Sequence, residues 1–310
     1  MKQLEPSNQT KLFGLNYHLL ELIRLYENRI YPNKLLLTGL KGIGKCTLAH
    51  HFINYVLSKN DETKYNLKDF KINSDNSIFK TILNKSNTNL ITIDVNTDKK
   101  SIDINQIRNL INNLNKSSFN NKPRFVLIDN IELLNINSIN ALLKVLEEPN
   151  DNINFILINN NKKTLPTLIS RCINYKINLS NKECLDVANQ LFDGKLSQFI
   201  NEDFINYYFT PGNIYHLIKF ADQYNYDISK ADLKSFLQIL IKDNLFKKDP
   251  FMKYIIFNLI EFYFRKISLS YSKIIYEKYS YFLKRIANTK KFNLDEETLF
   301  LEFKEEILDG

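Results

Sequence analysis

A glycine-rich loop between an apolar strand and an amphipathic helix is the feature that most restricts the fold of this chain. Residues 34–38, KLLLT, are typical of a short buried strand, and apolar residues recur at helical spacing over residues 48–56. The loop between them holds three of the chain's seven glycines: Gly39, Gly42 and Gly44. A strand, a glycine loop and a helix in this order predict an α/β domain whose loop cradles phosphate.

The loop continues into Lys45, Cys46 and Thr47, so it follows the pattern G-x-x-x-x-G-K-[ST] except at the last position. The loop's N–H groups would converge on phosphate oxygens, and Lys45 would face the outer phosphates. Cys46 stands where a hydroxyl binds magnesium, and a thiol is a poor ligand for that hard cation. Thr47 comes one residue late and is expected to point elsewhere. An ordinary glycine turn is the alternative, which the strand–helix context disfavours.

Residues 125–172 form a second informative segment. Four apolar residues end on Asp129, as in a parallel strand that is buried on both faces and presents an acid at its carboxyl end. Residues 136–146 have helical apolar spacing, and Pro149 should end that helix. A second apolar run, residues 155–158, is followed by three asparagines: Asn159, Asn160 and Asn161. The segment therefore predicts two strands of a sheet with polar residues at its ligand-binding edge.

Further apolar patterns complete the predicted sheet domain. Residues 89–95 and 173–177 have the character of strands, and the second alternates like an edge strand. Asp94, at the end of the first of these strands, is expected to be a solvated strand terminus, with a polar contact as the alternative. Helical spacing marks residues 12–30 and 104–114, while residues 58–88 are polar and should form helices and loops over the sheet.

The rest of the chain is predicted to be helical. One helix is expected from Phe199 to Tyr208, and another begins at Pro211. Tyrosine and phenylalanine are dense over residues 251–282; they could stack on bases, but their helical spacing favours a role in the core. We expect three domains: a P-loop sheet domain of residues 1–177, a helical lid of residues 178–224 and a C-terminal helical domain of residues 225–310.

The composition limits the possible functions. A chain of 310 residues with a net charge of +8 suits a multidomain protein with an anionic partner such as nucleic acid, although dispersed solvated lysines would give the same charge. The three cysteines are far apart, which argues against a disulfide framework or a four-cysteine zinc site and favours the reducing cytoplasm. The first ten residues lack a signal-peptide core, and the apolar run 251–264 is too short and too charged for a membrane span.

Two runs carry a specific resemblance to a known family. Residues 140–149, NALLKVLEEP, and residues 165–172, LPTLISRC, closely resemble the helix and the Ser-Arg-Cys segment of bacterial sliding-clamp loader subunits of the AAA+ superfamily. The resemblance covers residues 12–177 well, extends to about residue 224 more loosely, and reaches the remaining helices only by position and length. It implies a P-loop AAA+ domain with a parallel sheet, a helical lid and an all-α C-terminal collar that holds an oligomer.

Departures from the family pattern distinguish its motor (gamma/tau) subunits from its delta-prime subunits. Where the motor strand ends Asp-Glu, Asp129 is followed by Asn130, an amide that cannot take a proton from water at neutral pH. Glu132 is expected on the wrong side of the turn. Tyr215 stands where the motor lid carries an arginine that contacts the phosphates, and the motor's zinc module is missing. With Cys46, these changes imply that ATP hydrolysis is lost; binding of ATP or ADP stays open, and zinc is not expected.

Arg171, in contrast, keeps the family pattern. In the family this arginine is a finger that enters the ATP site of the neighbouring subunit, where its permanently charged fork suits the transferring phosphoryl group. The alternative is an ion pair with a carboxylate of its own domain. The resemblance assigns the trans site to Ser170, Arg171 and Cys172. It assigns the nucleotide site to Gly39, Gly42, Gly44, Lys45, Cys46, Thr47, Asp129 and Asn160.

The resemblance thus implies a delta-prime subunit of the DNA polymerase III clamp loader with little ATPase activity of its own. Its partners would be the gamma/tau and delta subunits in a hetero-pentamer, the sliding clamp and primed DNA, and no membrane. An active AAA+ ATPase, either a gamma/tau-type motor or a helicase loader, is the main alternative, favoured by Lys45 and Asp129. A P-loop kinase of small molecules is a weaker alternative without an acceptor-binding signature.

Overall fold

The computed structural model describes residues 4–96, 99–115, 120–147, 152–205, 209–268, 273–292 and 294–309. The chain packs into two compact units. The first contains residues 1–191 and 210–212, and the second contains residues 192–209 and 213–310. Within the ranges described, no helix is both long enough and apolar enough to cross a membrane.

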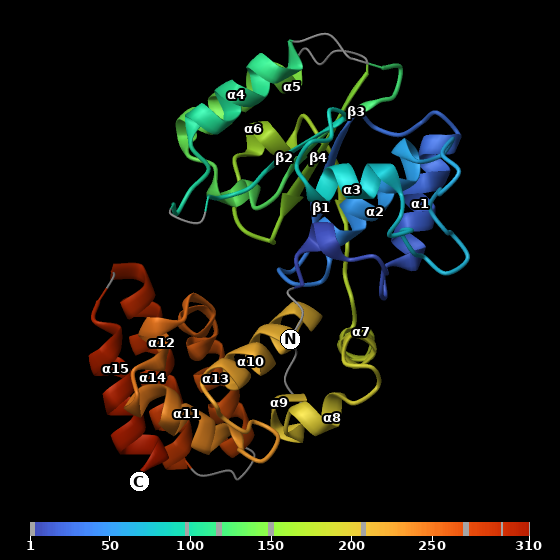
Figure 1. The fold of residues 1–310 in the computed structure, drawn as a ribbon. Coiled ribbons are helices and arrows are strands. Elements are labelled where there is room, and N and C mark those ends of the chain that lie inside the picture. The colour runs from blue at the N-terminus through green and yellow to red at the C-terminus, as the bar shows by residue number, and fades with distance from the viewer. Residues whose placement is uncertain are drawn as a thin grey trace. The chain divides into compact units, whose positions relative to one another are not determined.

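The first unit is built on a five-stranded sheet with the order β2-β3-β4-β1-β5, in which every pairing is parallel (Figure 1). The strands are β1 Lys34–Thr38, β2 Leu90–Ile93, β3 Arg124–Ile128, β4 Ile153–Asn159 and β5 Ile173–Lys176. All five strands lie where the apolar runs predict them, and β5 is an edge strand as expected. The predicted α/β P-loop class with a parallel sheet is therefore confirmed.

Helices cover both faces of this sheet (Figure 1). The first unit contains the helices α1 Asn16–Glu27, α2 Lys45–Leu57, α3 Ser77–Leu83, α4 Ile104–Leu114, α5 Ile136–Glu147, α6 Pro166–Ile169 and α7 Asn181–Leu191, with 3-10 turns η1 Pro6–Asn8 and η2 Ile131–Leu133. Because side chains alternate along a strand, Leu35 and Leu37 pack with α1 and α2, whereas Leu36 packs with α4 and α5. The last described residue of α5 is Glu147; Pro149, which was predicted to end this helix, lies outside the described residues.

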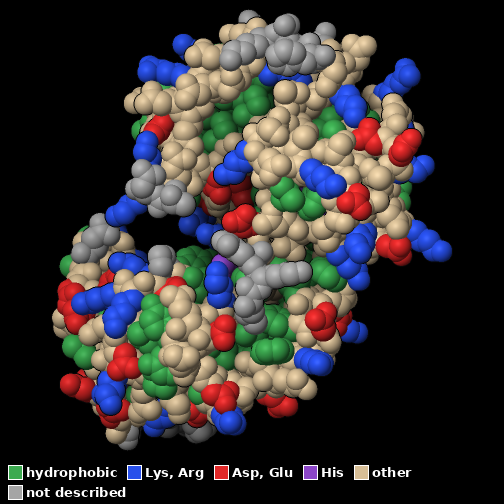
Figure 2. Space-filling model, viewed as in Figure 1, with side chains coloured by type: hydrophobic (Ala, Val, Ile, Leu, Met, Phe, Trp, Pro, Cys, Tyr) green, Lys and Arg blue, Asp and Glu red, His purple; other side chains and the backbone are tan. Residues whose placement is uncertain are grey.

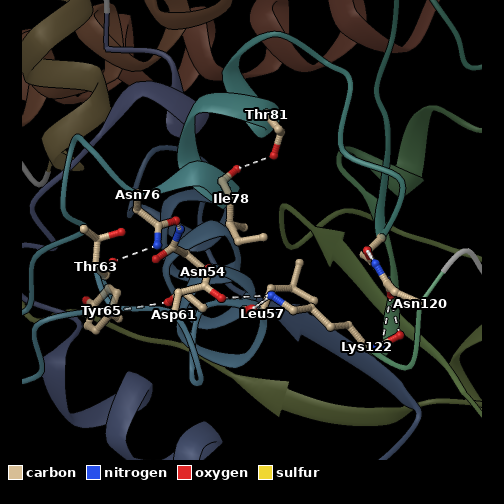
Figure 3. A network of polar contacts seen from close by, with 12 residues as sticks. Asn54, Leu57, Asp61, Thr63, Tyr65, Asn76, Ile78, Thr81, Asn120 and Lys122 are labelled. Carbon is tan, nitrogen blue, oxygen red and sulfur yellow. Dashed lines mark hydrogen bonds and ion pairs between the residues drawn. The ribbon is translucent and has the colours of Figure 1, made fainter.

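A network of polar contacts holds the long connection between α2 and α3 (Figure 3). Lys122 Nζ donates to the Leu57 carbonyl at 2.7 Å and pairs with Asp61 Oδ1 at 3.1 Å. The side chain of Asn76 begins α3 as its N-cap, and its amide donates to the Thr63 carbonyl at 2.7 Å. The connection therefore has a defined conformation although its sequence is mostly polar.

The second unit is helical, as the sequence predicts. Its elements are α8 Leu196–Phe199, α9 Glu202–Ile205, α10 Pro211–Gln223, α11 Leu233–Lys242, α12 Leu245–Lys248, α13 Pro250–Ser268, α14 Lys273–Phe292, α15 Glu296–Phe303 and the π-helix η3 Lys304–Leu308. Pro211 and Gly212, the first two residues of α10, belong to the first unit.

One predicted helix, Phe199 to Tyr208, is wrong. The chain forms two short helices instead, because Ile200 is extended with φ −146° and interrupts the helical path. Asn201 Oδ1 then accepts from the Asp203 N–H at 2.9 Å, which starts α9 as a new helix. Tyr208 lies outside the described residues.

The aromatic residues between positions 251 and 282 belong mainly to the core. Phe257, Phe264 and Phe282 are buried, and Phe264 packs against Phe282 with 5.7 Å between ring centroids. Tyr254 and Tyr281 are exposed. The core interpretation is therefore confirmed for these phenylalanines.

Candidate functional site

The predicted nucleotide-site residues lie at the carboxyl edge of the sheet. β1 and β4 end in register, with Thr38 opposite Asn159, and β3 ends beside β4. The residues that directly follow the three strands are Gly39, Asn160 and Asp129. The structure thus brings the loop, the acid and the asparagine together, as the sequence predicts for parallel strands.

The backbone of the loop takes up a conformation that favours glycine at Gly42 and Gly44. Gly42 and Gly44 have φ of 87° and 94°, in the left-handed region that other residues rarely occupy. Gly44 is also the N-cap of α2, so the loop leads directly into the positive end of that helix's dipole. Loop and helix together form the local geometry that suits a bound anion.

Lys45 has all three of its N–H donors engaged by the protein itself. Its Nζ donates to the carbonyls of Gly39 at 2.9 Å and Leu40 at 2.7 Å, and to Asn160 Oδ1 at 2.9 Å. The residue is only 4% exposed, and burial lowers the pKa of its ammonium to about 8 against the opposing pull of Asp129. Lys45 therefore braces the loop, and a phosphate could reach the ammonium only by displacing one of these acceptors.

The start of α10 packs directly on the same loop. The Gly212 N–H donates to the Gly42 carbonyl at 2.9 Å. A Cβ atom at position 212 would lie 2.7 Å from the Gly42 Cα and 3.0 Å from its carbonyl oxygen. Only glycine permits this approach. Tyr215, three residues further along, is buried within the second unit, and its phenol has no formal charge with which to hold a phosphate.

Cys46 contacts Asp129 where magnesium ligands are expected. The half-buried thiol of Cys46 donates to the Asp129 carboxylate, and burial raises the pKa of this thiol well above its usual value. Burial and the neighbouring Asp94 raise the pKa of Asp129 to about 6. The thiol is therefore protonated at neutral pH and is not a thiolate ligand. Thr47 lies one position further along the first turn of α2 and is half-buried.

A chain of side-chain hydrogen bonds connects the ends of the central strands. Asn130, in a left-handed conformation with φ 53°, donates through Nδ2 to Asp94 Oδ1 at 2.7 Å. Its Oδ1 accepts from Asn160 Nδ2 at 2.8 Å, and the same nitrogen donates to Glu132 Oε1 at 2.8 Å. Through Asn160 the chain reaches Lys45.

One sequence prediction is corrected by these contacts, and a second is extended. Glu132, predicted to lie on the wrong side of the turn, faces the site, because the left-handed Asn130 starts a 3-10 turn that brings the side chain back to Asn160. Asp94 is exposed, as predicted for a solvated strand terminus, and it also makes the polar contact that was the alternative: its carboxylate accepts a hydrogen bond from Asn130. Asp94 follows β2, the neighbour of β3 in a parallel sheet, so its contact with a residue that follows β3 could be expected from the strand order.

Arg171 lies at the opposite edge of the sheet. It precedes β5, whereas the loop follows β1, and a strand of four residues spans about 13 Å. Its Nε donates to Glu147 Oε1 at 3.1 Å, its Nη2 contacts the same oxygen, and its Nη1 donates to the Thr167 carbonyl at 2.8 Å. The alternative of an ion pair within its own domain is thus observed. In this position Arg171 cannot serve the loop of its own chain.

Ser170 and Cys172 support the turn that presents Arg171. Ser170 Oγ donates to the Thr167 carbonyl at 3.1 Å. Cys172 is 9% exposed within the core beneath α5, and burial raises the pKa of its thiol to about 11. Neither side chain has the environment of a nucleophile. Both therefore contribute by holding the turn that carries Arg171.

Several groups at the carboxyl edge differ from those that usually bind a magnesium–nucleotide complex. Cys46 offers a neutral thiol in place of a hydroxyl, and Asn130 offers an amide in place of a proton-accepting carboxylate. Lys45 is committed to the loop. Among the residues that the structure describes, no group of three or more histidine, cysteine, aspartate or glutamate side chains could hold a metal ion. The loop conformation alone remains suited to an anion.

Comparisons with known proteins identify a family that covers the sheet domain. Residues 17–181 match the profile of the family described as "DNA polymerase III, delta subunit". The chain is 27% identical over 195 residues to the DNA polymerase III subunit gamma of Buchnera aphidicola subsp. Schizaphis graminum, covering 61% of this chain and 50% of the relative. It is 33% identical over 177 residues to the subunit delta' of Buchnera aphidicola subsp. Baizongia pistaciae, covering 51% and 49%.

The chain spans about half the length of these relatives. Among solved structures, a gamma subunit-related protein of Thermotoga maritima aligns with 92% of this chain and 96% of its own, with a TM-score of 0.48 and 19% identity.

Proposed function

Because the chain belongs to the DNA polymerase III delta subunit family of clamp-loader proteins, we propose that it acts as a delta-prime subunit, which supplies Arg171 to a neighbouring ATPase subunit and does not hydrolyse ATP itself. The observation that carries the proposal is the contrast between two cations. Lys45 uses all its N–H donors inside its own loop, whereas Arg171 lies at the far edge of the sheet with part of its guanidinium exposed.

Several residues support the loss of hydrolysis. Asn130 cannot act as the base that orients and deprotonates water, and Cys46 is a poor magnesium ligand. Tyr215 brings no charge to the phosphates. Each of these positions supplies a separate part of the phosphoryl-transfer apparatus. With all of them changed, the site could position a nucleotide but would not catalyse its hydrolysis.

The proposed assembly follows from the family. The chain would join gamma/tau and delta subunits in a cytoplasmic hetero-pentamer that opens the sliding clamp and places it on primed DNA during replication. Within it, residues 1–177 would form the AAA+ domain, residues 178–224 the lid and residues 225–310 the collar. Lysines and arginines are dispersed among acids on the face drawn in Figure 2. We propose that DNA is contacted within the complex.

The test is a loader reconstituted with Arg171→Ala. If Arg171 is the finger, single-turnover ATP hydrolysis at the adjacent site should fall by about 10³-fold or more, and clamp loading should fall with it. The matched control is Arg24→Ala, which removes an exposed arginine that pairs with Glu21 on α1. Unchanged DNA-stimulated turnover in the Arg171 variant would exclude the finger role.

The second candidate function is an active AAA+ ATPase, of the gamma/tau or helicase-loader type. The observation that favours it is Glu132, whose carboxylate faces Asn160 at the site and is the nearest substitute for the missing glutamate. ATP turnover by the purified chain with DNA, abolished by Lys45→Ala, would establish this function. Binding of ATP or ADP, measured with and without magnesium, separates an anion-binding loop from a magnesium–nucleotide site.

A further inference from the structure

We propose that Glu147 is a positioning residue for Arg171: it holds one edge of the guanidinium so that the other edge faces the neighbouring subunit. The inference rests on the proposed trans role of Arg171. It assigns to Glu147 a part in the same chemistry, although this carboxylate would touch neither the nucleotide nor the reacting atoms.

Both residues are attached to backbone that the core fixes. Glu147 is the last described residue of α5 and directly follows Leu146, which is fully buried. Arg171 follows α6 and directly precedes Cys172, which is buried in the same core cluster as Leu146. Leu168, also fully buried in that cluster, anchors α6. The two backbones therefore hold the pair at a set separation, which is what precise positioning of a side chain requires.

The contacts leave a specific part of Arg171 available. A guanidinium has five N–H donors. Two of them, on Nε and Nη2, are directed at Glu147 Oε1, and one on Nη1 is directed at the Thr167 carbonyl. Among the described residues this leaves one N–H on Nη1 and one on Nη2 without a protein acceptor. Two such donors at the end of a planar fork match a pair of phosphate oxygens.

The exposure of the Arg171–Glu147 pair indicates that the pair orients the Arg171 side chain rather than stabilises the fold. The side chains of Arg171 and Glu147 are 32% and 51% exposed. Ion pairs this exposed stabilise a fold very little. Arginine nevertheless loses much rotamer freedom when it is fixed, and a guanidinium that is already held loses less on reaching the phosphoryl group. The ion pair with Glu147 therefore reduces the conformational entropy that Arg171 loses when it binds the phosphoryl group in the assembled loader.

The opposite interpretation is a lock, in which Glu147 must release Arg171 before the finger can act. The two differ in sign: removing a lock raises turnover, whereas removing a positioning residue lowers it. The donor count favours positioning, because the terminal edge of the guanidinium is open while Glu147 remains bound.

The experiment compares Glu147→Ala, Glu147→Gln and Arg171→Ala in the reconstituted loader, with Glu21→Ala as the control. Glu21 is the acid of another Arg–Glu pair on this unit, at 3.1 Å from Arg24. We expect Glu147→Ala to lower kcat for DNA-stimulated ATP hydrolysis about tenfold with KM nearly unchanged, since misplacement of a positioned group can cost up to about 10²-fold. Glu147→Gln should recover most of kcat, because its amide oxygen accepts the same N–H groups.

The outcomes separate the two proposals. Equal or faster turnover with Glu147→Ala, while Arg171→Ala is slow, would overturn the positioning role and leave the finger intact. A Glu147→Gln variant as slow as Glu147→Ala would also overturn it, because a hydrogen-bond acceptor would then not suffice. Unchanged turnover with Arg171→Ala would remove both proposals. Thermal unfolding of each isolated variant, expected to match the wild-type chain, excludes a folding defect.

Discussion

Counting donors distinguishes the two cations on which the proposed function depends. Lys45 has three N–H groups and three acceptors within its own chain, so the residue that usually holds a phosphate serves here as a brace. Arg171 has five N–H groups, of which Glu147 and Thr167 take three. A charged residue retained in a family motif can thus be structural in one place and available for a ligand in another.

Two adjacent histidines on α2 predict how stability depends on pH. His50 and His51 are buried, and burial lowers the pKa of each to about 4. His51 contacts the Tyr65 hydroxyl at 2.8 Å, whereas His50 Nδ1 has no hydrogen-bond partner in the described part of the chain. In the unfolded chain each binds a proton near pH 6.5. Their contribution to stability is therefore present above pH 6.5 and is lost as the pH falls toward 4.

We expect His50→Leu to weaken this acid dependence. Between pH 7 and 4.5 the wild-type chain should lose about 2 kcal/mol more unfolding free energy than the variant, since one proton-binding group is removed. Urea unfolding at the two pH values measures the difference. Asp129, whose raised pKa of about 6 acts in the opposite direction, is common to both proteins and cancels in the comparison. Parallel pH profiles would contradict the prediction.

At the scale of elements, the apolar runs predict the strands of the sheet, whereas the conformations of the turns cannot be predicted from the sequence. A strand such as β3 is visible because four consecutive apolar residues must be buried on both faces. The side of the turn on which Glu132 lies is not visible, because it depends on one left-handed residue, Asn130. The break in the predicted helix after Phe199 likewise depends on an asparagine cap that competes locally with helix continuation.

The site follows the same rule. Register and strand order place Gly39, Asp129 and Asn160 together, and this much could be predicted from parallel strands alone. The engagement of Lys45 and the pairing of Arg171 with Glu147 could not, because they depend on side-chain directions between segments far apart in the sequence.

In the first turn of α10, we expect a glycine-to-alanine substitution to lower the unfolding free energy rather than raise it. In an ordinary helix position, replacing glycine by alanine stabilises a protein by about 1 kcal/mol. At Gly212 the new Cβ would lie 2.7 Å from the Gly42 Cα, a backbone atom that cannot move without distorting the loop. We therefore expect Gly212→Ala to destabilise the chain by about 1–3 kcal/mol. Thermal or urea unfolding measures it, and a stabilised variant would show that the segment does not rest on the loop.

At the scale of the whole molecule, the two edges of one sheet have different roles in the proposal. In the proposed delta-prime role, the carboxyl edge has the fold of a nucleotide site but does not hydrolyse ATP, and the amino edge carries Arg171. A parallel sheet keeps these edges about one strand length apart, so a single domain can contribute to two subunit boundaries. The net charge of +8 then suits an assembly on DNA without requiring that this chain alone bind it.

This division predicts that one substitution will not restore ATP hydrolysis. Asn130→Glu would supply the missing carboxylate, but it would also break the hydrogen bond from Asn130 to Asp94 and place a third negative charge beside Asp94 and Asp129. Cys46 would still bind magnesium poorly. We expect the purified Asn130→Glu chain to remain at least about 10²-fold slower than a gamma/tau-type motor subunit assayed with the same DNA. Recovery to within tenfold would identify Asn130 as the sole defect and favour the active-ATPase alternative.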